Sequence, residues 1–117
     1  MAVFWYPYNE GHMIGKAGSE GVVVRDEEYA GKAQATLERD SVYNSAFVIT
    51  CSIYGWMTHT CHVVDEGDAY QAYEMIETEL TEIVDVLPDQ DDPEAEAQID
   101  QVYGYIRGFV NRWQTES

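Results

Sequence analysis

Basic residues are scarce in this chain of 117 residues: two lysines and four arginines accompany twenty-two acids, for a formal net charge of −16. Proteins bind DNA, RNA and anionic lipid largely through Lys and Arg contacts to phosphate. The composition therefore argues against a nucleic-acid-binding or membrane-surface protein, and it favours attraction toward cationic partners or metal ions. The same charge is also expected of a protein that only needs to be soluble, or of one from a source organism adapted to salt.

Long apolar runs and a secretory leader are also missing. No run of about eighteen apolar residues could span a bilayer. Residues 1–8 carry neither the basic segment nor the leucine-rich segment of a signal peptide. We therefore expect a cytoplasmic protein, in which the two cysteines are reduced thiols. Because 45% of the residues are apolar, we also expect an ordered core rather than a disordered chain.

Aromatic residues and glycines concentrate at the N-terminus. Phe4, Trp5, Tyr6 and Tyr8 precede a glycine-rich stretch, a pattern typical of irregular structure. We predict an irregular arm over residues 1–20. Its aromatic side chains would pack onto a single domain formed by residues 21–117.

Alternation of apolar and polar residues predicts four strands, and residues 26–30 would form the turn between the first two. The last two strands would form a hairpin around Gly55, whose loop length sets the register. An odd-length loop that pairs Cys51 with Cys61 separates core from solvent better than a two-residue loop, so we favour it. Against it, glycine usually comes last in a three-residue loop. The predicted strands span about 22–25, 31–39, 47–54 and 58–64. The predicted core face of the hairpin comprises Phe47, Ile49, Cys51, Ile53, His59, Cys61 and Val63.

Apolar residues at three- and four-residue steps predict two helices, over about 68–87 and 93–114. Pro88 would end the first helix, and Asp92 and Pro93 suit the cap and first position of the second. The short link favours antiparallel neighbours. Strands followed by helices predict a two-layer α+β fold. We expect an antiparallel meander of three or four strands with both C-terminal helices packed on one sheet face.

Two glycines lie one turn apart in the second predicted helix, at Gly104 and Gly108. Each costs about 1 kcal/mol relative to alanine inside a helix. The cost predicts close approach by another element. That element would be the first helix or, in a homodimer, a second copy of the chain.

Cys51, His59 and Cys61 are weak candidates for a metal site, because thiolate and imidazole are the usual ligands of zinc. The chain has no CxxC pair, so ordinary packing of buried cysteine accounts for them as well, and a disulfide between the cysteines is a third possibility. We expect no cofactor. The hairpin tip and the arm offer an alternative ligand-binding site. Its residues would be Tyr54, Trp56, His59, Trp5 and His12.

Fourteen acids and no basic residue lie between Asp65 and Asp100. Several acids of the first predicted helix stand at i,i+3 spacing, where each like-charge pair costs roughly 0.2–0.5 kcal/mol. Because these like-charge pairs destabilise the helix, we expect this surface to be used for binding a partner. The expected contact residues are Glu74, Glu77, Glu79, Glu82 and Asp85.

No motif with the spacing of a nucleophile–base pair or a phosphate loop is found, so the residues favour a non-enzymatic protein. We predict an interaction protein that binds a basic partner protein through its acidic helical surface, as an immunity protein, an inhibitor or a nucleic-acid mimic would. The alternatives are a small-molecule or metal-binding domain that uses the hairpin, and a globular domain with a role that the sequence does not reveal.

Overall fold

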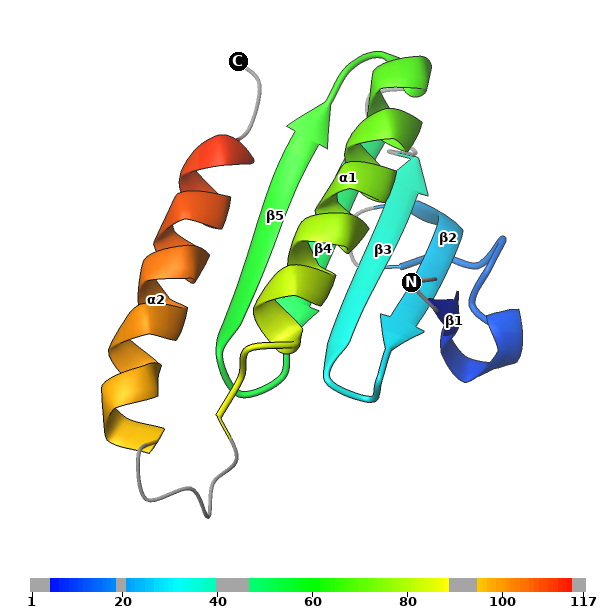
Figure 1. Ribbon diagram of the computed structural model, residues 1–117. Helices are drawn as coiled ribbons and strands as arrows, with labels where there is room; N and C mark the ends of the chain where they lie inside the picture. The colour runs from blue at the N-terminus through cyan, green and yellow to red at the C-terminus, as the bar shows by residue number, and fades with distance from the viewer. Residues whose placement is uncertain (1–4, 19–20, 40–46, 89–94, 115–117) are drawn as a thin grey trace.

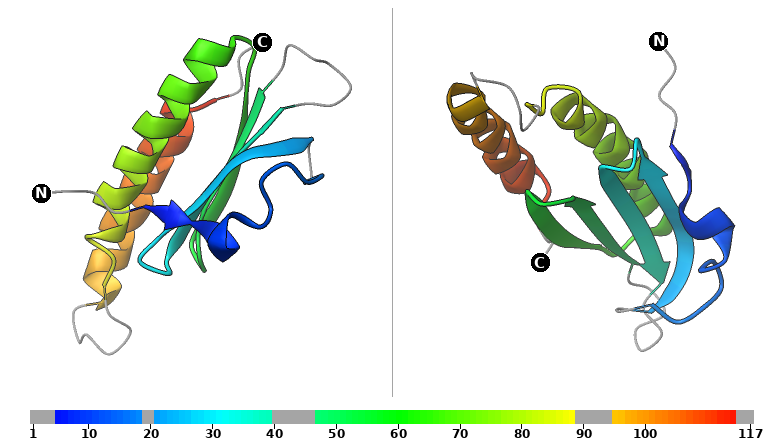
Figure 2. Two further views of the ribbon diagram at one scale, coloured as in Figure 1. Left: turned by 90° about the vertical axis from the view of Figure 1, so that its right-hand side faces the viewer. Right: turned by 90° about the horizontal axis from the view of Figure 1, so that it is seen from below.

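The computed structural model describes residues 5–18, 21–39, 47–88 and 95–114. A five-stranded antiparallel sheet is followed by two helices that pack on it, which gives an α+β fold (Figures 1 and 2). Both helices lie on the same side of the sheet, and they run in opposite directions. The elements are β1 (Tyr6–Pro7), the short 3₁₀ segment η1 (Tyr8–Gly11), β2 (Val22–Tyr29), β3 (Ala33–Arg39), β4 (Phe47–Ile53), β5 (Met57–Val63), α1 (Glu66–Val84) and α2 (Ala95–Arg112).

The strand order β1-β2-β3-β4-β5 follows the chain. The predicted α+β meander is therefore confirmed, but the sheet has five strands rather than three or four. The additional strand is β1, which belongs to the segment predicted to be an irregular arm. Its two residues, Tyr6 and Pro7, pair with Glu28 and Glu27 of β2. Pro7 suits this place because β1 is an edge strand, where proline does not interrupt a ladder on both sides.

The first long strand, β2, continues to Tyr29, so the turn predicted at residues 26–30 is wrong. The three acids of this segment lie within the strand and alternate between the two sheet faces. The chain turns at Ala30 and Gly31 instead, which have positive φ angles of 55° and 65°. The Lys32 N–H donates to the carbonyl of Tyr29 at 2.9 Å. Positive φ at both central residues suits the twist of a tight hairpin.

The hairpin of β4 and β5 has the predicted faces but a different register. Cys51 pairs with His59, and Cys61 pairs with Ile49, so the predicted pairing of the two cysteines is wrong by two residues. A shift of two residues leaves every side chain on its original face. The predicted core face of the hairpin is therefore confirmed: its six apolar members belong to the buried core, and half-buried His59 contacts Phe109 of α2.

The loop between β4 and β5 has three residues, since Ile53 pairs with Met57. Gly55 stands in the middle of this loop rather than at its last position, with a φ of 82°. The Trp56 N–H closes the turn by donating to the carbonyl of Ile53 at 2.8 Å. Gly55 is thus the third residue of a four-residue turn, a position that requires positive φ in the type II geometry.

The core lies between the sheet and the two helices. Leu37 of β3, Tyr73 of α1 and Phe109 of α2 are each 0% exposed, and burial of a large apolar side chain contributes roughly 1.5–3 kcal/mol. α1 begins two residues earlier than predicted, because the Asp65 side chain caps it by accepting from the Asp68 N–H at 2.9 Å. α1 ends at Val84 and α2 at Arg112, two or three residues before the predicted ends. The predicted caps of α2, Asp92 and Pro93, fall outside the described residues.

Candidate functional site

The five acids predicted to contact a partner all lie on α1 or at its C-terminal cap, but they occupy three different environments. Glu79 and Glu82 line a groove between α1 and α2. Glu74 and Asp85 are exposed, and each contacts a side chain of β2. Glu77 is buried, with 7% of its surface exposed. The prediction of one exposed acidic face is therefore wrong for Glu77, and Glu74 and Asp85 lie apart from the groove.

The interhelical groove, as we call this hollow, has a volume of about 390 Å³. Val86 and Tyr105 are 47% and 46% exposed, so apolar surface is open to solvent there. Glu82 is exposed as well, and no cation contacts its carboxylate within the part of the chain that the structure describes. The groove is lined by Glu79, Glu82, Ile83, Val86, Gly104, Tyr105, Gly108 and Arg112.

The second acid of the groove, Glu79, is held by α2 and the residue that follows it. The guanidinium of Arg112 forms an ion pair with one carboxylate oxygen of Glu79, and the indole N–H of Trp113 donates to the other at 2.5 Å. The Glu79 side chain is only 20% exposed, whereas that of Arg112 is 57% exposed. Charge-assisted bonds of this kind are among the stronger polar contacts in proteins. One cation of the chain therefore already occupies the groove.

Gly104 and Gly108 keep the α2 wall of the groove open. A Cβ at Gly104 would come within 4 Å only of the side chain of Arg107, at 3.9 Å, and one at Gly108 only of the side chain of Arg112, at 3.3 Å. Both neighbours belong to α2 itself. The expected close approach of the first helix is therefore wrong for the residues that the structure describes. The glycines instead leave unfilled space beside α1.

Glu77 belongs to a buried polar cluster between α1 and β2. Its carboxyl is hydrogen-bonded to the side chain of Glu27 and lies beside the Tyr73 hydroxyl, and its Oε2 atom has no partner among the described residues. Burial, followed by the hydrogen bond to Glu27 and the charge of that residue, raises the pKa of Glu77 to about 9, although the positive charge of Arg25 opposes the shift. Glu77 is therefore protonated at neutral pH and can donate to Glu27.

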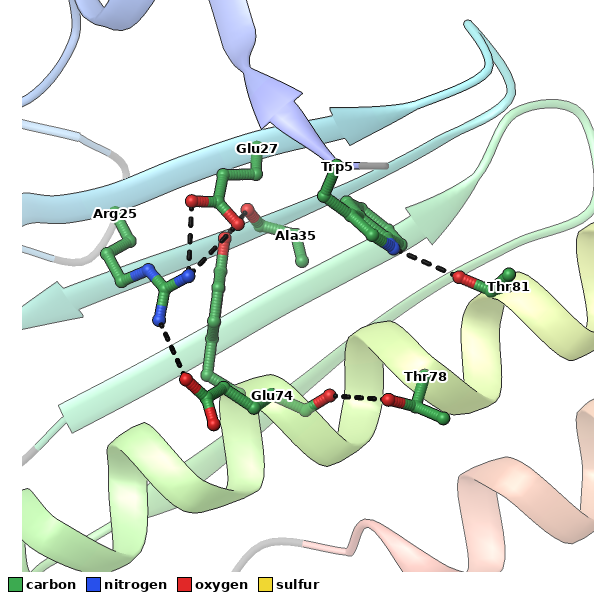
Figure 3. Close-up of polar contacts among 8 residues, drawn as sticks. Trp5, Arg25, Glu27, Ala35, Glu74, Thr78 and Thr81 are labelled. Atoms are coloured by element: carbon green, nitrogen blue, oxygen red, sulfur yellow. Dashed lines mark hydrogen bonds and ion pairs between the residues drawn. The ribbon is translucent and has the colours of Figure 1, made fainter. Parts of the chain in front are cut away.

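Arg25 balances the charge of this cluster. One guanidinium nitrogen lies 3.1 Å from each carboxylate oxygen of Glu27, and the other lies 3.8 Å from Glu74 of α1 (Figure 3). The guanidinium also stands 4.6 Å from the centre of the Tyr73 ring, a favourable cation–π distance. The Tyr73 hydroxyl donates to the carbonyl of Ala35 in β3 at 2.6 Å. The cluster thus ties α1 to two strands.

The N-terminal arm is fastened beside this cluster by Trp5. Its indole N–H donates to the Thr81 hydroxyl at 3.0 Å (Figure 3), and its ring stacks on Tyr29 at a centroid distance of 5.6 Å. The Tyr29 hydroxyl in turn donates to Asp85 at 2.9 Å. The Asp85 carboxylate, which was predicted to contact a partner, therefore accepts a hydrogen bond from within the chain.

Sequence reasoning missed the buried cluster, although a signal was present. Glu77 stands four residues after Tyr73 and three before Leu80, within the apolar stripe of the helix. A charged residue at such a position indicates a buried and partnered carboxyl. Two carboxyls in different environments can perform acid–base chemistry. However, neither Glu77 nor Glu27 lines any of three hollows found on the helical surface of the described residues, so we interpret the cluster as structural.

The five residues of the alternative ligand site do not come together. Trp5 packs against β2, whereas His59 belongs to β5, and three strand spacings between them amount to about 14 Å. Tyr54 lies on the sheet face opposite the helices, where its hydroxyl donates a hydrogen bond to Glu28 at 2.5 Å. His12 is exposed on the arm.

Two residues of that predicted site do meet α2. The ring of Trp56 lies 5.4 Å from that of Tyr103. The rings of His59 and Phe109 form a T-shaped contact with their centroids 6.3 Å apart, and the His59 Nε2 lies 2.5 Å from the carbonyl oxygen of Trp113. These contacts attach the hairpin to α2, which is a structural use of both side chains.

The weak metal candidates share one sheet face, as predicted. Cys51 and Cys61 are free thiols, so the disulfide alternative is not realised. Cys51 is 1% exposed, and burial raises the pKa of its thiol to about 12. No group of three or more His, Cys, Asp or Glu side chains could hold a metal ion among the described residues. The hypothesis of a Cys51, His59 and Cys61 metal site therefore gains no support.

None of the helices, over the ranges that the structure describes, is long and apolar enough to cross a membrane. Comparison of the chain with protein-family models, with curated proteins and with solved structures found no match.

Proposed function

We propose that this protein is a non-enzymatic interaction protein that binds a basic segment of a partner protein in the interhelical groove. The observation that carries the proposal is the exposed carboxylate of Glu82, which lies beside the exposed apolar side chains of Val86 and Tyr105. Charge and apolar surface occur together in one hollow, which is the composition expected of a binding surface rather than of a surface that only needs to be soluble.

The charge of the whole chain supports the same proposal. A net charge of −16 attracts cationic proteins over distances of about a Debye length and accelerates their association. Within the groove, Glu79 and Glu82 stand at i,i+3 spacing and repel one another. A cation placed between them would relieve that repulsion. Arg112 does so for Glu79, and a partner would do so for Glu82.

The chemistry of the groove suits binding better than catalysis. Glu79 contacts a cation and an indole N–H, and Glu82 is exposed to solvent. Neither carboxyl is placed in an apolar site, which is how proteins prepare a carboxylic acid for proton transfer at neutral pH. The groove offers fixed negative charge, which would attract the cationic side chains of a partner.

The test is capture of proteins from the source cell by the tagged chain at low salt, followed by mass spectrometry. We expect basic proteins to be retained, to elute as salt rises, and to be lost with Glu82→Lys. Glu10→Lys changes the net charge equally but lies on the exposed arm, so it should retain them. Equal capture by both variants, or capture that ignores salt, would contradict the proposal.

A further inference from the structure

A second hollow continues the interhelical groove along α1. It has a volume of about 290 Å³ and is bounded by the first half of α1, the end of α2 and β5. Arg112 lines both hollows. We call the two together the trough. Its α1 wall consists of Asp68, Gln71, Ala72, Met75, Glu79, Glu82, Ile83 and Val86.

Most of these wall residues follow one another at steps of three or four positions, and the others are direct neighbours of one of them in the sequence. They therefore lie along a single face of the helix. From Asp68 to Ile83 the face is about 22 Å long at a rise of about 1.5 Å per residue, and Val86, in the turn that follows α1, extends it further. Met75 and Val86, near the middle and at one end, are 57% and 47% exposed. The trough therefore has the length and the open apolar surface that a helix of about five turns could cover.

The opposite wall explains why a helix could come close. Gly104 and Gly108 present no side chain, and no atom of α1 would lie within 4 Å of a Cβ added at either position. Packed helices stand roughly 8–10 Å apart, and the shortest separations need small residues at the contact. α2 thus leaves space beside α1 where the backbone or a small side chain of a third helix would fit.

We propose that the trough binds an amphipathic, basic α-helix of the partner, about 18 residues long, as the third helix of the layer. This inference rests on the proposed function and specifies the structure of the element that is bound. The apolar side of that helix would cover Met75, Val86 and Tyr105, while its cations would meet Asp68 and Glu82. A second copy of this chain is a poor occupant, because each copy carries a net charge of −16 and the two would repel.

The probe is a fluorescent peptide of about 18 residues, built of Leu and Lys with Leu at helical spacing. A peptide of the same composition, with its order changed so that no apolar stripe forms, is its matched control. Binding is measured by fluorescence anisotropy, and helix formation in the peptide by circular dichroism. We expect the amphipathic peptide to bind and become helical. We expect the control peptide to bind at least about tenfold more weakly, a difference of one decade in Kd.

Two substitutions at one position test the place of binding. Gly104→Ala improves helix propensity with almost no added bulk, whereas Gly104→Leu fills the trough wall. Apart from the backbone of α2 itself, the one atom of the described residues within 4 Å of the new Cβ belongs to the side chain of Arg107, at 3.9 Å. Both variants should therefore fold at least as stably as the parent. We expect Gly104→Leu to raise the Kd of the amphipathic peptide at least about tenfold, since overpacking of a close contact is costly. We expect Gly104→Ala to change this Kd little.

The outcomes separate the two proposals. If Gly104→Leu binds the amphipathic peptide as tightly as Gly104→Ala does, or if both peptides bind equally, the helix-in-trough inference is wrong. In that case, loss of binding with salt and with Glu82→Lys, but not with Glu10→Lys, would leave the proposed function intact. If neither peptide binds, or if binding ignores both salt and Glu82→Lys, the proposed function fails together with the inference.

Discussion

The replacement Glu77→Gln should stabilise this protein at alkaline pH. Glutamine has the shape of a protonated glutamic acid and can still donate to Glu27, but it cannot ionise. The parent Glu77 has a pKa of about 9 in the folded protein, against an ordinary value of 4.5. Between these two pH values the folded state keeps a proton that the unfolded state has released. The parent therefore loses stability as pH rises through this window, and the variant does not.

The magnitude follows from the width of the window. Each pH unit between the two pKa values costs about 1.4 kcal/mol of unfolding free energy. From about pH 4.5 to pH 8 the full loss would be about 5 kcal/mol. Relaxation of the protein and entry of water around an ionised carboxylate reduce such penalties, so we expect Glu77→Gln to gain roughly 2–4 kcal/mol at pH 8. Near pH 4.5 the variant and the parent should be equally stable.

The assay is urea unfolding followed by circular dichroism at pH 5, 6, 7 and 8. Glu82→Gln is the matched control, because it makes the same side-chain replacement at an exposed position of the same helix, where it can only relieve general charge repulsion. The difference in unfolding free energy between Glu77→Gln and the parent should grow with pH. The difference between Glu82→Gln and the parent should stay small. Parallel pH profiles for the parent and Glu77→Gln, or a variant that is less stable at pH 8, would refute the buried-proton argument.

Three further outcomes follow from buried contacts. Tyr73→Phe removes the 2.6 Å hydrogen bond to Ala35 and should lower the unfolding free energy by about 1–2 kcal/mol, measured by urea unfolding; no loss would mean that the hydroxyl is not used. Trp5→Phe removes the bond to Thr81 and should cost about 1 kcal/mol. The readout is faster hydrogen exchange at the Tyr6 amide, because the other residue of β1, Pro7, has no N–H; unchanged exchange would show that the arm is held by other contacts. Cys51, with a thiol pKa raised to about 12 by burial, should react with a disulfide reagent at pH 8 only as fast as the protein opens; rapid reaction in the folded state would contradict the buried placement.

The β4–β5 hairpin shows which part of a fold the pattern of residues determines. Alternation has a period of two, so it correctly assigned Cys51, His59 and Cys61 to the core face. The same period cannot distinguish two registers that differ by two residues, because both bury the same side chains. The register was decided by the loop, where Gly55 takes positive φ in the middle position.

The acids of β2 and α1 show where patterns fail. Residues 26–30 were predicted to form a turn, yet they continue β2 as far as Tyr29, and Glu27 faces the helices and is balanced by Arg25. Glu77 was expected on the surface, because acidic residues are usually exposed. That general preference does not take account of a partner side chain on another element. The two errors have one cause: the contact between the two carboxyls joins β2 to α1, and these residues are fifty positions apart in the chain. The groove itself could not be predicted, because it depends on how far α2 stands from α1.

The strand order of the sheet has a consequence for how the chain folds. Each strand pairs with the one that precedes it, so most strand contacts join residues that are close in sequence, and no strand has to be inserted between two earlier ones. Low contact order of this kind is associated with rapid folding. The sheet can grow by adding one hairpin arm at a time, and the arm strand β1 needs only β2 to be in place. α2 follows α1 in the chain and packs with it on the same side of the sheet.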